Sequence, residues 1–197
     1  MRRTICGRML LAGVWLMCGP HLWGQQYGPD SGNSRGLQVA VLYDALYSNV
    51  VRANQFWMQG GSIQVYGQFW RGLGVEADVS GVHAGNANNA GVGLNLVATT
   101  FGPHYGWSSA HRRYSLFGHA LVGEAHGFDS VFSSAGTTSS SADGLAFQMG
   151  GGMDVRLKRR FSLRVFEADW LRTQLPNADT NVQNSLRLAA GVVLRFR

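Results

Sequence analysis

Histidine and serine are the residues of this 197-residue chain that could most directly do chemistry. Imidazole binds metals and transfers protons, and a serine hydroxyl can act as a nucleophile. The spacing of the histidines nevertheless matches no His-Glu-x-x-His metal motif, and no catalytic triad can be recognised among them. Beyond the first 24 residues the histidines are His83, His104, His111, His119 and His126. We therefore expect no catalytic residues, no metal ligands and no cofactor.

Charged residues in several segments instead recur at every second position, opposite apolar ones. Residues 73–80 place Glu76 and Asp78 opposite valine and leucine. Residues 185–197 place Arg187 and Arg195 opposite six apolar residues, ending with Phe196. A period of two indicates a β-strand with two unlike faces. A strand of ten or more residues also has the length that a tilted strand needs to cross a bilayer.

The same alternation gives eight strands, which begin near residues 37, 61, 73, 92, 114, 144, 160 and 185. The phase slips between Arg164 and Phe166, which predicts a β-bulge. Short connections at 71–72, 105–113 and 158–159 alternate with long ones at 49–60, 84–91, 127–143 and 173–182. This order predicts an all-β fold, an eight-stranded antiparallel up-and-down transmembrane β-barrel. The serine-rich connection at 127–143 is expected to be a mobile loop.

The first residues resemble an export signal. Arg2, Arg3 and Arg8 precede an apolar run of about ten residues, and Gly24 offers a cleavage site before Gln25. We expect a signal peptide over 1–24, a flexible segment over 25–36 and the barrel over 37–197. Both cysteines lie in the leader, so the exported chain would contain no disulfide. The leader holds three of the 17 basic residues and none of the 11 acidic ones. The remainder carries a charge of +3, which gives no indication of nucleic-acid binding.

The interior of an eight-stranded barrel is just wide enough to be filled by side chains. Because a buried charge is costly unless it is paired, we expect an ion-pair network there. Glycines 150–152 would leave room for a large neighbouring side chain. The expected members of the network are Asp44, Glu76, Asp78, Asp154, Arg156, Glu167, Asp169, Arg187 and Arg195.

Several stretches resemble the small outer-membrane β-barrel domain proteins of the OmpA-like and OmpX-like class. They are Phe101-Gly102-Pro103, residues 117–121, residues 150–156, Arg164 with residues 168–170, and residues 186–188 before Ala190-Gly191. The resemblance implies a transmembrane barrel in the Gram-negative outer membrane, usually without enzymatic activity. Gly191, Leu194 and Phe196 are similar to the signal by which such barrels are recognised for assembly. The partners would then be outer-membrane lipids and the barrel-assembly machinery, and we expect a monomer.

These observations favour a structural or surface barrel, not an enzyme, whose long loops contact an unknown ligand. A narrow pore for small solutes is an alternative. A lipid-modifying barrel enzyme is another, with His126 and Ser130 as the nearest pair at the outer edge. A soluble lipocalin-like barrel would show the same alternation with its apolar face turned inward. Alternation alone does not choose between these two barrels, but the strand length, the aromatic residue near the C-terminus, the leader and the resemblance favour the membrane barrel.

Overall fold

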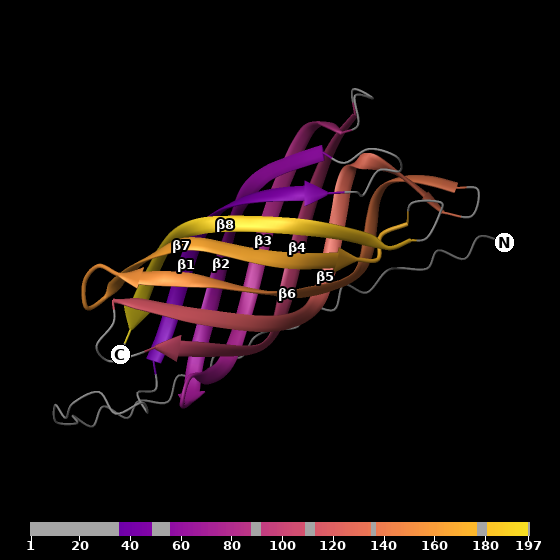
Figure 1. Ribbon diagram of the computed structural model, residues 1–197. Helices are drawn as coiled ribbons and strands as arrows, with labels where there is room; N and C mark the ends of the chain where they lie inside the picture. The colour runs from indigo at the N-terminus through magenta and orange to yellow at the C-terminus, as the bar shows by residue number, and fades with distance from the viewer. Residues whose placement is uncertain are drawn as a thin grey trace.

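The computed structural model describes residues 36–48, 56–87, 92–108, 113–134, 137–176 and 181–196. These residues form a closed antiparallel barrel in which each strand pairs with its neighbours in sequence and β1 pairs with β8, as predicted (Figure 1). The strands are β1 (Gly36–Ser48), β2 (Phe56–Trp70), β3 (Leu73–Ala87), β4 (Val92–Ser108), β5 (Tyr114–Ser134), β6 (Thr137–Arg156), β7 (Phe161–Thr173) and β8 (Gln183–Phe196). The predicted leader and nearly all of the 25–36 segment lie outside the described residues.

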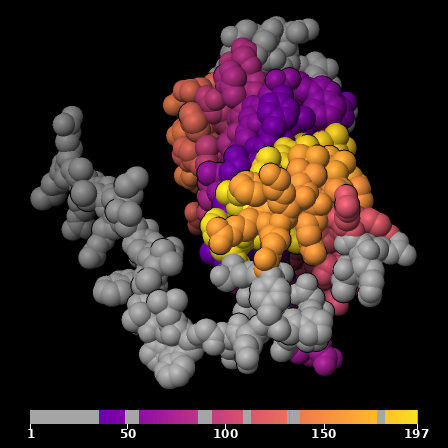
Figure 2. All heavy atoms as spheres, turned by 90° about the vertical axis from the view of Figure 1, so that its left-hand side faces the viewer, coloured from indigo at the N-terminus to yellow at the C-terminus, as the bar shows by residue number. Residues whose placement is uncertain are grey.

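The barrel has a turn end and a loop end. At the turn end, short connections join β2 to β3, β4 to β5, and β6 to β7; at the loop end lie the other four connections. The β2–β3 connection contains only Arg71 and Gly72, which both have positive φ (36° and 87°). This is the backbone conformation of a two-residue hairpin turn whose twist matches the flanking strands. A space-filling view toward the turn end shows β8 (yellow) beside β1 (indigo), where the barrel closes (Figure 2).

The predicted alternation is confirmed on the strands with clean patterns. On β8 Arg187 and Val193 are buried while Leu188 and Phe196 face outward, and on β3 Glu76 and Asp78 are buried. On β5 both faces are largely apolar, so the sequence left the choice open. The structure turns Phe117, His119 and Leu121 inward.

The predicted bulge in β7 is also confirmed. Arg164 and Phe166 pair with consecutive residues of β6, so that Val165 is the additional residue. Val165 and Phe166 both face outward, whereas Arg164 and Glu167 are both buried. The bulge therefore brings two residues three positions apart to the same side of the strand.

The prediction that residues 127–143 form a connecting loop is wrong. β5 and β6 continue past the other strands as a hairpin, with His126 paired to Asp143 and Ser134 paired to Thr137 (right side of Figure 1). Cross-strand hydrogen bonding and the burial of Phe132 hold this segment, although its composition is polar. β2, β3 and β4 likewise extend into the predicted connections, to Phe56, Ala87 and Ser108.

The interior has different layers along the barrel. A large apolar cluster fills the loop end, and a small one, with Ala40 and Val193, lies toward the turn end. The loop-end cluster contains Leu46, Met58, Val82, Ala84, Leu94, Leu96, Ala98, Ala125, Phe132, Ala146, Leu171 and Leu175. No helix in the described part of the chain is long and apolar enough to cross a membrane.

Candidate functional site

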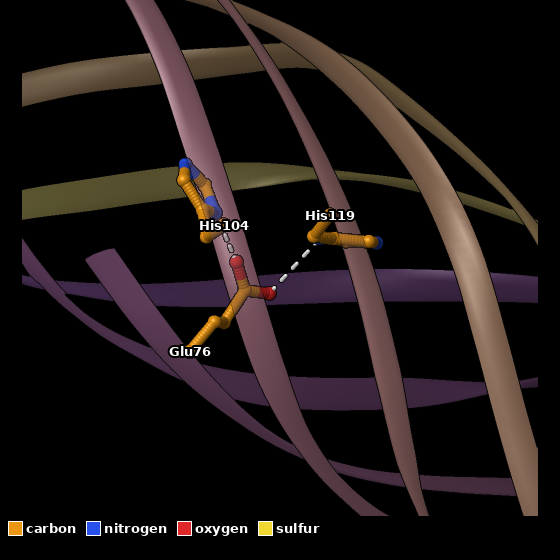
Figure 3. Close-up of side chains that lie close together, drawn as sticks. All are labelled: Glu76, His104 and His119. Carbon is orange, nitrogen blue, oxygen red and sulfur yellow. Dashed lines mark hydrogen bonds and ion pairs between the residues drawn. The ribbon is translucent and has the colours of Figure 1, made fainter. Parts of the chain in front are cut away.

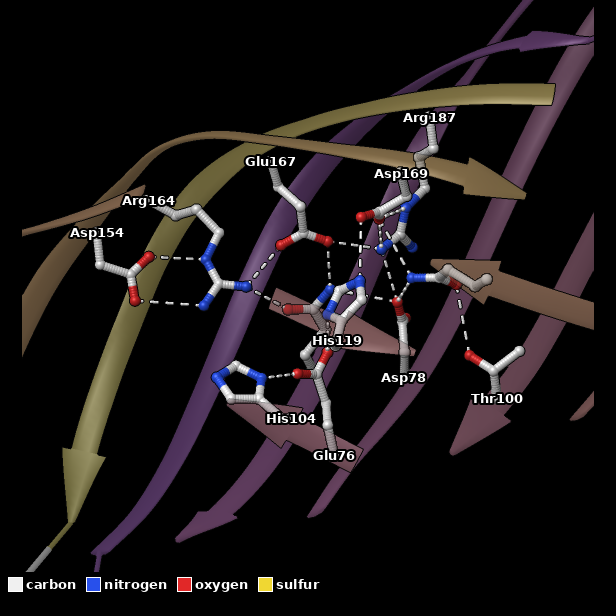
Figure 4. A network of polar contacts seen from close by, with 12 residues as sticks. Glu76, Asp78, Thr100, His104, His119, Asp154, Arg164, Glu167, Asp169 and Arg187 are labelled. Atoms are coloured by element: carbon white, nitrogen blue, oxygen red, sulfur yellow. Dashed lines mark hydrogen bonds and ion pairs between the residues drawn. The ribbon is translucent and has the colours of Figure 1, made fainter. Parts of the chain in front are cut away.

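Buried charged side chains converge between the two apolar clusters (Figure 4). Arg187 on β8 is only 1% exposed, and its Nη2 lies 2.7 Å from a carboxylate oxygen of each of Asp78, Glu167 and Asp169. Its Nη1 lies 4.0 Å from Asp44 on β1. One guanidinium therefore holds carboxylates from strands on both sides of β8 and across the barrel.

Arg164 forms a second centre of the network. Its Nε and Nη2 donate to the two oxygens of Asp154 at 2.8 and 3.3 Å, the paired geometry that suits a planar guanidinium. Its Nη1 donates to Glu167 Oε2 at 2.6 Å. This contact depends on the bulge at Val165, because strict alternation would place Arg164 and Glu167 on opposite faces.

Two buried glutamines connect these centres. Gln64 Nε2 donates to Glu167 Oε1 at 2.7 Å and to Asp78 Oδ2 at 3.2 Å. Gln148 Nε2 donates to Asp78 Oδ2 at 3.1 Å and to Asp169 Oδ2 at 3.2 Å. Neutral amide donors thus supply hydrogen bonds to carboxylates that two arginines alone do not satisfy.

A cluster of Glu76, His104 and His119 adjoins the network on the turn-end side (Figure 3). His104 Nδ1 contacts Glu76 Oε2, and His119 Nδ1 lies 3.2 Å from Glu76 Oε1. The other nitrogen of His119, Nε2, lies 3.0 Å from Asp169 Oδ1. His104 and His119 face each other directly in the β4–β5 register.

Planar side chains hold the position of His104. Its ring stacks on Tyr66 with centroids 3.9 Å apart and on Phe117 with centroids 5.2 Å apart. The Arg164 guanidinium carbon lies 4.0 Å from the centre of the Phe117 ring, in cation–π geometry. Tyr66 is itself tied to the turn, because its hydroxyl donates to the Gly72 carbonyl at 3.0 Å.

Glycines on β6 make the room that this packing needs, as expected. A Cβ on Gly150 would come within 2.0 Å of Asp169 Oδ1, and one on Gly152 within 2.9 Å of the Phe117 ring. The Asp169 carboxylate and the aromatic ring therefore occupy space that any larger residue on β6 would take.

The structure places seven of the nine expected residues among these nearly inaccessible charged side chains, and the other two lie nearer the turn end. The seven are Asp44, Glu76, Asp78, Asp154, Glu167, Asp169 and Arg187. Arg156 and Arg195 lie near the turn end and are only partly buried, and Arg195 Nη2 contacts Ser115 Oγ at 3.5 Å.

The sequence reasoning did not include Gln64, His104, His119, Gln148 and Arg164 in the network. Gln148 could have been predicted, because the alternation of residues 144–157 places it on the same face of the strand as Asp154.

The other singled-out residues lie apart from the network. His126 faces outward near the loop end, with Nδ1 2.5 Å from Asp143 Oδ1. Ser130 is partly buried. On β8 Leu194 and Phe196 point outward and Gly191 points inward.

No protein-family model matches the chain, and no curated protein matches its sequence. Solved structures do match. The attachment invasion locus protein Ail of Yersinia pestis is 17% identical, with 82% of this chain and 99% of that chain covered and a TM-score of 0.56. Neisserial surface protein A is 13% identical, with 81% and 97% covered and a TM-score of 0.61. The likeness shows that this chain has the eight-stranded fold found in outer-membrane barrels.

Proposed function

We propose that the chain spans the outer membrane as a β-barrel, has no enzymatic activity, and presents its loop end for contact with surfaces outside the cell. The observation that carries this proposal is the direction of the two faces. Arg187, Asp78 and Glu167 are buried, whereas large apolar side chains are exposed on all eight strands. A soluble ligand-binding barrel has the opposite arrangement, and the lipocalin-like alternative loses its support.

The exterior fits a bilayer in its details. Outward-facing aromatic residues lie toward both ends of the strands: the partly exposed Tyr47 pairs with Trp57 at the loop end, and Tyr105 pairs with Trp107 at the turn end. Interfacial aromatic girdles have this arrangement. Outward-facing charged residues of the strands, such as Glu124 and Asp143, lie toward the loop end, where they would reach beyond the lipid.

The interior supports a structural barrel more than a pore. The loop-end cluster places Leu94, Phe132 and Leu175 across the interior, all nearly inaccessible to solvent. The ion-pair network fills the space on the turn-end side of these residues. With both layers packed, we propose that the lumen passes little or nothing.

The proposed surface contacts would be made by the loop end. The β5–β6 hairpin exposes Ser139, Ser140 and Ser141 there. One of the two similar proteins is named for attachment and invasion, and the other is named a surface protein. We propose a comparable surface role here, together with contacts to outer-membrane lipids and to the barrel-assembly machinery through the outward face of β8.

Cysteine labelling tests the location and the orientation together. The only cysteines lie at positions 6 and 18, so the mature chain can carry a single introduced thiol. Ser140→Cys should react with a membrane-impermeant maleimide on intact cells. Lys158→Cys, exposed in the β6–β7 turn, should react only after the outer membrane is permeabilised. A folded barrel migrates differently on a gel until the sample is boiled in detergent, which gives a heat-dependent gel shift. Equal labelling of both variants in the soluble periplasmic fraction, together with the absence of this shift, would refute the membrane barrel.

Adhesion of intact cells to a cultured epithelial monolayer tests the surface role. Expression of the chain should raise the number of attached cells above the vector control. Changing Ser139, Ser140 and Ser141 to Glu should remove this gain while leaving the heat-dependent gel shift of the folded barrel. Attachment equal to the vector control would contradict the surface role alone.

A further inference from the structure

The buried interior contains more negative than positive groups. Its nearly inaccessible titratable side chains are six carboxylates, two arginines and two histidines among the described residues. With both histidines neutral, these carboxylates outnumber the arginines by four. Uncompensated buried charge is strongly unfavourable, so positive charge at the histidines, carried either by protons or by a bound cation, would lower its cost.

Glu76 is the place where a cation fits. The other five buried carboxylates each have an arginine within 4.0 Å. Within 4.0 Å Glu76 has only the two histidines as charged partners in the described part of the chain. No arginine therefore competes with a cation at this carboxylate.

The donor atoms have the separation of metal ligands. One ligand atom from each of Glu76, His104 and His119 lies within 4.8 Å of the others. Bonds of about 2.0 to 2.1 Å in tetrahedral geometry place two ligand atoms about 3.3 Å apart. Glu76 Oε1 and His119 Nδ1 are 3.2 Å apart, and both are buried without a hydrogen-bond partner among the described residues.

The surroundings of the two imidazoles also suit a metal centre. A metal-bound histidine usually donates its second ring N–H to a carboxylate, which fixes its tautomer. His119 has this partner in Asp169 Oδ1, 3.0 Å from Nε2. The ring of His104 is fixed by its stacking between Tyr66 and Phe117. Both donors are thus held in place before any ion binds.

A second group of potential ligands, His119 with Glu167 and Asp169, is less suitable. Arg187 Nη2 lies 2.7 Å from an oxygen of each of these carboxylates. A metal ion there would be placed next to a guanidinium and would be repelled by it.

We propose that His104, His119 and Glu76 bind one zinc ion inside the barrel, through both Nδ1 atoms and the carboxylate. Two imidazoles and a carboxylate are a typical ligand set for zinc, and a fourth position remains for water. The ion would join β3, β4 and β5, and its two positive charges would take the place of the protons that histidines bound to a metal no longer carry. This site is independent of the proposed surface role, since it lies in the interior and faces no loop.

To test this proposal, the mature chain is refolded in detergent with zinc chloride. Gel filtration removes unbound metal, and mass spectrometry then measures the zinc that remains bound to the chain. Wild type should retain one zinc per chain. H119Q and H104Q should retain almost none, and H83Q should retain the full amount because His83 is exposed and bonded to Asn95. Replacement by cobalt should give visible absorption bands of a histidine-bound ion in wild type and H83Q only.

The heat-dependent gel shift of each sample reports folding separately from metal content. If a histidine variant fails to fold, the comparison is made with E76Q, which keeps the shape of the side chain and should lower zinc affinity at least tenfold. Folded wild type without zinc would overturn the proposal. So would zinc retention by a folded H119Q or E76Q barrel at the wild-type level.

Discussion

Replacing Arg187 by methionine should destabilise the barrel more than any exposed charge change. The guanidinium touches Asp78, Glu167 and Asp169 at 2.7 Å each and is 1% exposed. Removing one partner of a buried ion pair costs about 3 to 5 kcal/mol, because the remaining charges stay buried without compensation. With three carboxylates affected at once, we expect a loss at the upper end of that range.

Urea unfolding of the chain folded into phospholipid vesicles, followed by tryptophan fluorescence and by the gel shift, measures this loss. Arg160→Met in the exposed β6–β7 turn is the matched control and should change the free energy of unfolding by less than about 0.5 kcal/mol. Adding Glu167→Gln to Arg187→Met should recover part of the loss, since one unpaired charge is removed. A change below about 1 kcal/mol for Arg187→Met would refute the view that the network stabilises the interior.

Three further results are expected. Leu188→Arg should cost about 2 to 4 kcal/mol in vesicles if this outward residue lies at mid-bilayer, and unchanged unfolding would reject its contact with lipid. Gly150→Ala should cost about 1 to 3 kcal/mol, because the methyl group meets the Asp169 carboxylate, whereas Gly67→Ala meets no atom within 4 Å and should be nearly neutral in the same urea titration. Planar-bilayer recordings of the wild-type chain should show no stable conductance, and reproducible channel openings would contradict a closed lumen.

Much of the barrel could be predicted because strand alternation is a local property. The two faces of β8, the bulge in β7 and the shared face of Glu76 and Asp78 follow from which residues stand two positions apart. The buried carboxylates were identified for the same reason. Alternation places these charges together on one face, and the strand lengths and the resemblance to outer-membrane barrels indicated that this face turns toward the lumen.

The histidine cluster could not be predicted because it depends on register. His104 was expected at the end of its strand, and His119 lies on a strand whose two faces are equally apolar. Their proximity results from the β4–β5 pairing, and that of Glu76 from the β3–β4 pairing. The extended β5–β6 hairpin was missed for a similar reason, since Phe132 finds its packing partners on other strands.

The closure of the barrel has a consequence for how the chain reaches its native state. Leu37 pairs with Phe196, so the first and last strands meet across nearly the whole described sequence. Contacts between such distant segments form slowly, because the chain entropy must be lost before they stabilise anything. Until β8 docks on β1, both strands keep an open hydrogen-bonding edge beside apolar side chains, which is the surface that aggregates. Damage confined to β8 should therefore leave the other seven strands vulnerable to aggregation and proteolysis as one unit.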